Sequence, residues 1–426
     1  MVIIPLLIFI TSVCIAIFKP SGGRLTFILI SIGINPIANQ FGIFSSARIS
    51  MVGNIFMHLI YPIILNPKAL RTLLSRTGLL VLTIIFFSTL QMAFSVDSNS
   101  SSYTAGFKTI LLMLGSWFWA QSLSIEIIRN YGYLTNRLLI KELFIVSILV
   151  LLISLFFRNL YFLDGRYQAA GGFTSPAILS ALIIILSLMC SEIRTYLRIA
   201  VIAFEIAILI TTGSRGVLIA LLVSIALISM NNALKAKKVG DPIGLRLIPN
   251  IFVLFSVVGF FFIDILTRYR SFEFLNLLNS DSEERIGTLG FRQDLFARMI
   301  DEYQDFSLSE KIFGLGAGSG TSLAMNYISN LRDSNYTSGR VFHNGFLQLL
   351  IEAGLIGVIF FLFFALAVFH FRKSSNISGF GYIWTIFYLI ALFFTSNPFA
   401  TSGLLAGLIY TIFLVPTYRI KLKDDH

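Results

Sequence analysis

Long apolar runs, separated by short polar segments, recur along most of the chain. A helix needs about 20 predominantly apolar residues to cross a bilayer, and many of these runs approach that length. The pattern therefore predicts an all-α fold, a polytopic helical membrane protein with about 12–13 transmembrane helices. Asn35 and Pro36 interrupt the second run, and whether that run crosses fully decides between the two counts. The runs fall near 3–18, 25–41, 50–66, 77–95, 104–124, 140–157, 176–191, 197–211, 216–231, 247–265, 349–371, 379–396 and 402–416.

One polar segment is far longer than the other connections and divides the chain. Connections of this length are uncommon between packed elements and are often functional. We therefore expect N-terminal transmembrane helices, an outer cap and C-terminal transmembrane helices, together with two short outer loops. The helical parts are 1–265 and 343–426, the cap is 266–342, and the short outer loops lie near 158–175 and 211–216.

Within the cap, two stretches have a readable local structure. Apolar side chains at helical spacing predict a helix over 292–304. A glycine-rich turn follows at 313–320. The helical spacing is carried by Phe291, Leu295, Met299 and Tyr303.

Composition supports the membrane interpretation. The chain is 56% hydrophobic and only 12% charged, with a mean hydropathy of +0.84. Soluble domains carry about 25% charged residues. The net charge of +11 does not predict nucleic-acid binding, because Lys and Arg collect on the cytoplasmic side of membrane proteins.

The distribution of positive charge predicts the orientation in the membrane. Seven segments, alternating with the other short loops, together hold 19 Lys and Arg, whereas those other short loops hold four. This bias places the first set in the cytoplasm and the cap on the periplasmic or outer side. The cytoplasmic set consists of 19–24, 67–76, 126–141, 192–198, 232–246, 372–378 and the C-terminal tail.

Arg215 is the sharpest candidate among the outer residues. It lies in Gly213-Ser214-Arg215-Gly216, between two apolar runs. A planar guanidinium in a glycine-flanked turn suits bidentate binding of phosphate. The alternative is an arginine that extends into the lipid headgroups and anchors a helix end.

Four further arginines are expected on the same side. Arg166 lies in the loop near 158–175, and Arg292 opens the predicted cap helix. We interpret them as candidate substrate-binding residues together with Arg285 and Arg298. Pairing with nearby acids is the alternative, and those acids are Asp164, Asp281, Glu283 and Glu284.

His343 and Asn344 end the cap where an apolar run begins. Of the four histidines in the chain, His343 is the one expected near the outer face. An imidazole titrates near neutral pH and can accept a proton, and the neighbouring amide both donates and accepts hydrogen bonds. The alternative is a histidine that bonds to the backbone at the start of the following helix. Glu352, nine residues on, is an acid within the apolar run.

Several motifs are absent from the sequence. It contains no Asp-x-Asp motif, no His/Cys cluster and no phosphate-binding Walker sequence. These absences disfavour a metal-dependent or nucleotide-sugar transferase, so no metal and no cofactor is predicted. If phosphate is bound here, arginine binds it.

The outer motifs resemble those of the O-antigen ligase and polymerase superfamily of bacterial envelope enzymes. In that family a histidine is followed directly by Asn, Ser or Gln. A glycine comes after nine further residues, and Gly, Thr or Tyr comes after two more. His343, Asn344, Gly354 and Gly357 match this pattern. Three upstream elements are also similar, namely Phe313-Gly314-Leu315-Gly316, Gly213-Ser214-Arg215-Gly216 and Gly165-Arg166 with Gly172 and Pro176.

The resemblance implies a metal-independent glycosyltransferase acting on undecaprenyl-diphosphate-linked glycans. It implies an active site at the periplasmic face of the bacterial inner membrane, with His343 and Arg215 as catalytic residues. The partners would be the lipid-linked donor and acceptor, the bilayer and a chain-length regulator, with no nucleic acid.

The resemblance leaves the acceptor open. A polymerase transfers the glycan to another carrier-linked repeat unit, whereas a ligase transfers it to lipid A–core. The long cap favours the polymerase, and the ligase remains the alternative. A flippase or other transporter is disfavoured because the charge gathers in the outer loops rather than among many helices.

Overall fold

The computed structural model confirms the all-α class. Over the residues that it describes, the chain is helical apart from one short pair of strands. The described residues are 3–18, 24–34, 53, 55–74, 76–94, 107, 110–111, 114–115, 117–123, 125–126, 136–163, 166–167, 174–189, 193–239, 288–320, 323, 344–370, 386–387 and 389–391.

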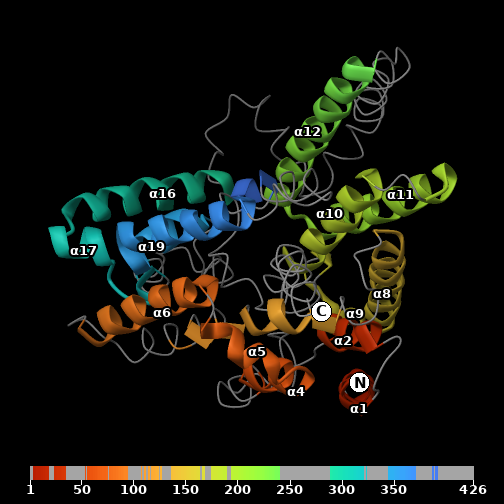
Figure 1. The fold of residues 1–426 in the computed structure, drawn as a ribbon, viewed down its shortest axis with the longest axis horizontal. Helices are drawn as coiled ribbons and strands as arrows, with labels where there is room; N and C mark the ends of the chain where they lie inside the picture. Colours follow the sequence, from red (N-terminus) through yellow and green to blue (C-terminus); the bar gives the residue numbers. More distant parts are fainter. Residues whose placement is uncertain are drawn as a thin grey trace, which may run out of the picture.

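Figure 1 shows the arrangement of the helices that the structure describes. The first elements are α1 (Ile3–Phe18), α2 (Arg24–Ile34), a π-helical turn (Phe56–Ile60), α4 (Tyr61–Leu65), α5 (Lys68–Arg71), a 3-10 turn (Thr72–Leu74) and α6 (Arg76–Phe94). Next come α8 (Asn136–Phe156), α9 (Arg158–Tyr161), α10 (Thr174–Met189), α11 (Thr195–Thr212) and α12 (Arg215–Val239). The last are α16 (Thr288–Asp305), α17 (Leu308–Phe313) and α19 (Gly345–His370).

Within the described residues, one helix is both long and apolar enough to cross a bilayer, and it is α11. Shorter apolar helices cover 3–18, 24–34, 56–65, 176–188, 216–229 and 345–359. The runs at 247–265 and 402–416 lie outside the described residues. The number of spans therefore stays a prediction.

One difference from the sequence prediction concerns the end of α12. The apolar run predicted a helix over 216–231 followed by a cytoplasmic loop, whereas α12 continues to Val239. The added residues are rich in Ala, Leu and Lys, which favour the helix even where the apolar pattern has stopped.

The helices form two groups (Figure 1). In one, α10 packs against α8, α11 and α12, and α2 joins α1 to α8. In the other, α19 packs against α17 and α6, and α16 lies alongside. The middle of α10, residues 181–187, is buried all round, as expected for a helix that is apolar on every face.

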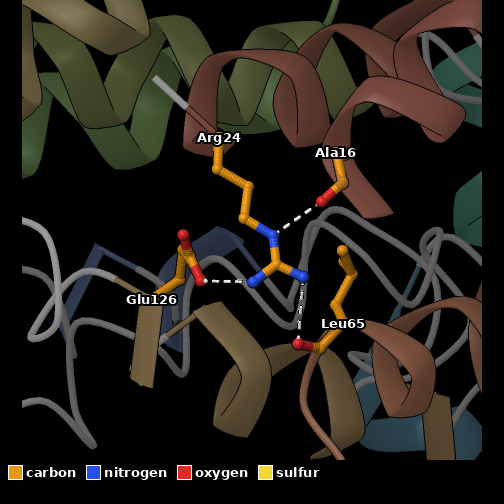
Figure 2. Close-up of polar contacts among 4 residues, drawn as sticks. All are labelled: Ala16, Arg24, Leu65 and Glu126. Carbon is orange, nitrogen blue, oxygen red and sulfur yellow. Dashed lines mark hydrogen bonds and ion pairs between the residues drawn. The ribbon is translucent and has the colours of Figure 1, made fainter. Parts of the chain in front are cut away.

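Arg24 joins several helix ends, as Figure 2 shows. Its Nε donates to the Ala16 carbonyl at 2.6 Å, and its Nη2 donates to the Leu65 carbonyl at 3.1 Å. Its Nη1 forms an ion pair with Glu126 Oε2 at 3.4 Å. A buried guanidinium is tolerated only when it is paired and hydrogen-bonded, and this one is. All four residues belong to helix ends that the charge distribution predicts to be cytoplasmic.

A small hairpin follows α9, where the sequence analysis expected only a loop. Strand β1 (Phe162–Leu163) pairs antiparallel with β2 (Arg166–Tyr167). Asp-Gly between aromatic-containing segments is a strong hairpin signal, so this element could have been predicted. Burial raises the pKa of Tyr167, so its hydroxyl stays neutral. The Tyr161 hydroxyl donates to the Ile34 carbonyl, which places the hairpin near the C-terminal end of α2.

Candidate active site at the outer helix ends and the cap

The turn between α11 and α12 places Arg215. Gly213 ends α11 in the left-handed region, with φ 63° and ψ 24°, and its N–H donates to the Ile210 carbonyl at 3.0 Å. Arg215 is then the first residue of α12, and the first turn of that helix contains no acidic residue. A helix N-terminus carries partial positive charge, so this position favours an anion. The side chain of Arg215 lies outside the described part of the structure.

Connectivity brings Arg166 to the same end of the helix group. The hairpin links the C-terminus of α8 to the N-terminus of α10, and β2 packs against α11. Because α10 and α11 are joined by a short connection and pack along each other, the start of α10 and the end of α11 also share this end. We call it the outer end. It holds the backbones of Arg166 and Arg215, although the contacts of their side chains are not described.

Helix α19 is sharply bent, whereas the apolar run predicted one continuous helix. Gly354 has φ 63° and ψ −168°, which is not helical. Phe346 and Phe361 would lie roughly 22 Å apart along a straight helix. Their ring centroids are 6.0 Å apart, so the two halves fold back toward each other. The first half, residues 345–353, is too short to cross a bilayer alone.

The glycine turn of the cap docks at this bend. Breaking the helix leaves the last carbonyls of its first half without their usual donors. The Leu315 N–H donates to the Ile351 carbonyl at 2.7 Å, and the Gly316 N–H donates to the Glu352 carbonyl at 3.0 Å. The turn therefore supplies the hydrogen bonds that the bend removes.

The backbones approach so closely that side chains do not fit. A Cβ atom at Gly314 would lie 2.5 Å from the Glu352 carbonyl carbon, and one at Gly354 would overlap the Ile312 carbonyl. Both glycines also have positive φ, which disfavours other residues. A Cβ at Gly357 would overlap that of Ala353. The glycine spacing of the family pattern therefore has a physical reason, which is the bend and the docked turn.

Asn344 begins the first half of α19 as its N-cap. Its Oδ1 accepts from the Leu347 N–H at 3.0 Å, and its carbonyl accepts from the Gln348 N–H at 3.0 Å. This arrangement is a normal N-cap, and it engages Oδ1 rather than the amide nitrogen. One turn later, Gln348 Nε2 donates to Glu352 Oε1 at 2.9 Å, and both side chains are buried.

The cap helix predicted over 292–304 is confirmed as the longer α16. Leu295 and Met299 form a buried cluster with Leu347 and Ile351 of α19. Phe313, at the end of α17, stacks on Phe87 of α6 with centroids 5.8 Å apart. The cap thus contacts the first half of α19 along one face and α6 at one end.

The structure describes only some of the remaining predicted site residues. Arg292 lies in α16, but its side chain is not described, and Arg298 is exposed on the same helix. Arg285 and His343 lie outside the described residues. Among the described residues, no three His, Cys, Asp or Glu side chains gather closely enough to hold a metal ion.

Sequence reasoning missed the partner of the glycine turn. It identified Gly314 and Gly354 as separate motif positions but not as a contact pair. Two glycine motifs flanking a helix start are a usable signal, because glycine marks close approach of backbones.

Comparison with known proteins agrees with this organisation. A family model described as O-Antigen ligase matches residues 199–362, a range that includes the Arg215 turn, the cap and the first half of α19. No curated protein matches the chain. The match over residues 199–362 supports the O-antigen ligase and polymerase superfamily, whose members are membrane proteins and glycosyltransferase-like enzymes of O-antigen processing.

Proposed function

We propose that the protein polymerises undecaprenyl-diphosphate-linked repeat units of O-antigen or a related surface polysaccharide. It acts as a multi-pass enzyme at the periplasmic face of the bacterial inner membrane, without metal or cofactor. The proposed parts are the helices of 1–265, the periplasmic cap of 266–342 and the helices of 343–426. The family match supports the transferase class, and the long cap favours the polymerase.

The joint between the cap and α19 is the observation that carries this proposal. Hydrogen bonds from Leu315 and Gly316 attach the cap to the half-helix that directly follows His343. The same half-helix packs on α16, the helix that contains Arg292 and Arg298. The arginine-bearing helix α16 and the half-helix that begins after Asn344 are therefore parts of one packed unit.

The proposed reaction is direct displacement at the anomeric carbon of the donor. The acceptor oxygen forms the new C–O bond as the bond to the diphosphate breaks, and the diphosphate leaves with the electron pair. Arg215, with Arg166, Arg285, Arg292 or Arg298, neutralises the charge that develops on the leaving group. His343 accepts the hydroxyl proton, and Asn344 contributes its amide nitrogen to binding. Displacement in one step inverts the anomeric configuration.

The ligase remains a second candidate because the matching family is described as O-Antigen ligase. Ligase and polymerase would use the same donor and the same leaving group. They differ only in whether the acceptor is a second carrier-linked glycan or lipid A–core, so the acceptor is the quantity to test.

Reconstitution with defined substrates tests the proposal. The purified protein in bilayers receives a synthetic undecaprenyl-diphosphate repeat unit, alone or with lipid A–core, and the products are separated by size. A ladder from the repeat unit alone supports the polymerase, and a single transfer that requires lipid A–core supports the ligase. Absence of both products from folded protein with an authentic repeat unit contradicts the proposed activity.

Labelling of single cysteines tests the orientation. In a variant without Cys14 and Cys190, a cysteine at Glu310 should react with an impermeant reagent added from the periplasmic side. A cysteine at Lys237 should react only after the membrane is opened. The reverse pattern contradicts a periplasmic cap.

A further inference from the structure

Glu205 is a buried acid in the middle of α11, the helix that is long and apolar enough to cross a membrane. Its side chain is 0% exposed. Ser147 Oγ of α8 donates to Glu205 Oε2 at 3.2 Å. The other carboxylate oxygen, Oε1, has no hydrogen-bond partner among the described residues. Such a group is costly in a membrane span and calls for a functional explanation.

Polar residues form a seam around this acid. Three helices each contribute two polar residues seven positions apart, which places each pair on one helix face. Helices α8 and α11 contact each other through Ser147 and Glu205, and through Phe144 and Phe204, whose ring centroids are 5.3 Å apart. Helix α10 packs against both of them. All six residues are buried, and they are Ser147 and Ser154 of α8, Ser180 and Ser187 of α10, and Glu205 and Thr212 of α11.

The hydroxyl of Ser180, on α10 beside Glu205, also lacks a hydrogen-bond partner among the described residues. Its side chain faces Glu205 from α10, yet its Oγ has no partner of hydrogen-bond geometry among the described residues. Two neighbouring oxygen atoms, Glu205 Oε1 and Ser180 Oγ, are therefore both unsatisfied. An ionised carboxylate is only an acceptor, whereas a protonated one also donates. A hydrogen bond between Oε1 and Ser180 Oγ would satisfy both atoms, with the proton supplied by either the carboxyl or the hydroxyl. Because an ionised carboxylate buried without a counter-charge is costly, the protonated carboxyl is favoured.

The charged groups described around Glu205 do not provide a cation that would neutralise its carboxylate. Tyr167 of β2 is the titratable group that faces it from the hairpin, and its hydroxyl is neutral. Arg198 lies on the same helix face, but roughly 10 Å away along the axis, and it donates to the Ile193 carbonyl at 3.1 Å. The contrast is Glu126, whose charge is matched directly by Arg24.

We propose that Glu205 is a proton-binding site within the membrane, which holds one proton and donates it to Ser180. The protonated carboxyl would connect α11 to α8 through Ser147 and to α10 through Ser180. The site lies two helical turns before the C-terminal end of α11, which leads to Arg215. A proton is favoured over a metal cation because Glu205 lies in no group of three or more His, Cys, Asp or Glu side chains among the described residues. This inference stands apart from the proposed transferase activity, because it concerns a group that the reaction does not use.

Infrared difference spectroscopy on the full protein in bilayers tests the site. The spectrum of wild type minus Glu205→Gln at neutral pH should contain the carbonyl band of a protonated carboxyl, and this band should shift in D₂O. The matched control is Glu302→Gln, which changes an exposed acid of α16 and should lose a carboxylate band instead. Glutamine imitates the protonated acid, so Glu205→Gln should keep the wild-type melting temperature.

Two results would overturn the proposal. One is a carboxylate band in the Glu205 difference spectrum. The other is loss of the protonated band when Na⁺ replaces N-methylglucamine, which indicates a metal-cation site. If Glu205→Gln does not accumulate, wild-type protein is treated with a hydrophobic carbodiimide, which modifies protonated carboxyls. The peptide containing Glu205 should then carry the label in both salts, and its absence counts against the proposal.

Discussion

The two ends of the helix group that contains α2 both carry arginines. Arg24 lies at one end, and Arg166 and Arg215 lie at the other. Arg24 begins α2 and is matched by one carboxylate and two carbonyls. The other end of α2 contacts Tyr161, beside the hairpin that carries Arg166. Arg215 also lies at that outer end, at a helix start with no acid in its first turn. The first arrangement cancels a positive charge inside the protein, whereas the second brings the backbones of two arginines to one end of the helix group.

The comparison shows why an arginine count does not identify a functional site. A buried guanidinium with all its nitrogen atoms matched is a structural element, whose loss should affect folding. An arginine at a helix N-terminus, preceded by glycine, adds to the positive end of the helix dipole. Its loss should affect binding of an anion more than folding. The following predictions test this difference.

The largest effect is expected at His343, the proposed proton acceptor. If His343 accepts the acceptor proton, His343→Ala should lower the rate about 10²–10⁴-fold. Donor binding should change little, because arginines hold the diphosphate. The rate of the wild type should also fall below pH ~6.5, where an unperturbed imidazole becomes protonated. Initial rates across pH measure both effects.

The control for this prediction is His343→Asn. Asn344 already occupies the N-cap of α19, so a capping role for His343 is not required by the helix. A fully active His343→Asn enzyme with the same pH profile would rule out proton transfer by His343.

The second effect concerns Arg215. Arg215→Lys keeps the charge but not the planar fork, so activity should fall about 10²-fold while the melting temperature stays constant. The matched control is Arg194→Lys at the other end of α11, where the exposed side chain donates to the Tyr196 hydroxyl at 3.1 Å. Equal activities of the two variants would contradict phosphate binding by Arg215 and would support the alternative, in which Arg215 anchors a helix end in the lipid headgroups.

Arg24 should behave in the opposite way. Arg24→Ala removes the cation that pairs with the buried Glu126 carboxylate, which should cost about 3–5 kcal/mol of folding free energy. Replacing both partners, with Arg24→Met and Glu126→Leu, should recover most of that loss. Thermal unfolding of the wild type and of these two variants measures both effects. A stable single variant with reduced specific activity would contradict the structural role.

The smallest effect is expected at the bend of α19. Gly354→Ala introduces a Cβ that overlaps the Ile312 carbonyl, at a positive φ that itself costs about 1–3 kcal/mol. The cap turn should detach locally, and proteolysis within the cap should become faster. Gly345→Ala is the control, because Gly345 lies in the same half-helix at a helical position. Equal cleavage rates would show that the turn is not held at the bend.

Several parts of the site could be predicted because they depend on residues that are close together in the sequence. A helix over 292–304 follows from apolar spacing, and the positions of Arg215 and of the glycine turn follow from glycine-flanked polar segments. The hairpin at Arg166 was also readable from Asp164-Gly165, but it was missed. The bend at Gly354 was not predicted, since apolar residues continue on both sides of it.

The sequence by itself determined the helical membrane class, the approximate helix limits and the residues able to carry the chemistry. These properties depend on neighbours along the chain, whose spacing is visible in one dimension. Only the tertiary structure decided that Arg24 is matched by Glu126, that Leu315 and Gly316 satisfy the carbonyls freed at Gly354, and that Glu205 faces unsatisfied Ser180. Each of these pairings joins segments distant in sequence, so folding alone determines which polar atom finds a partner.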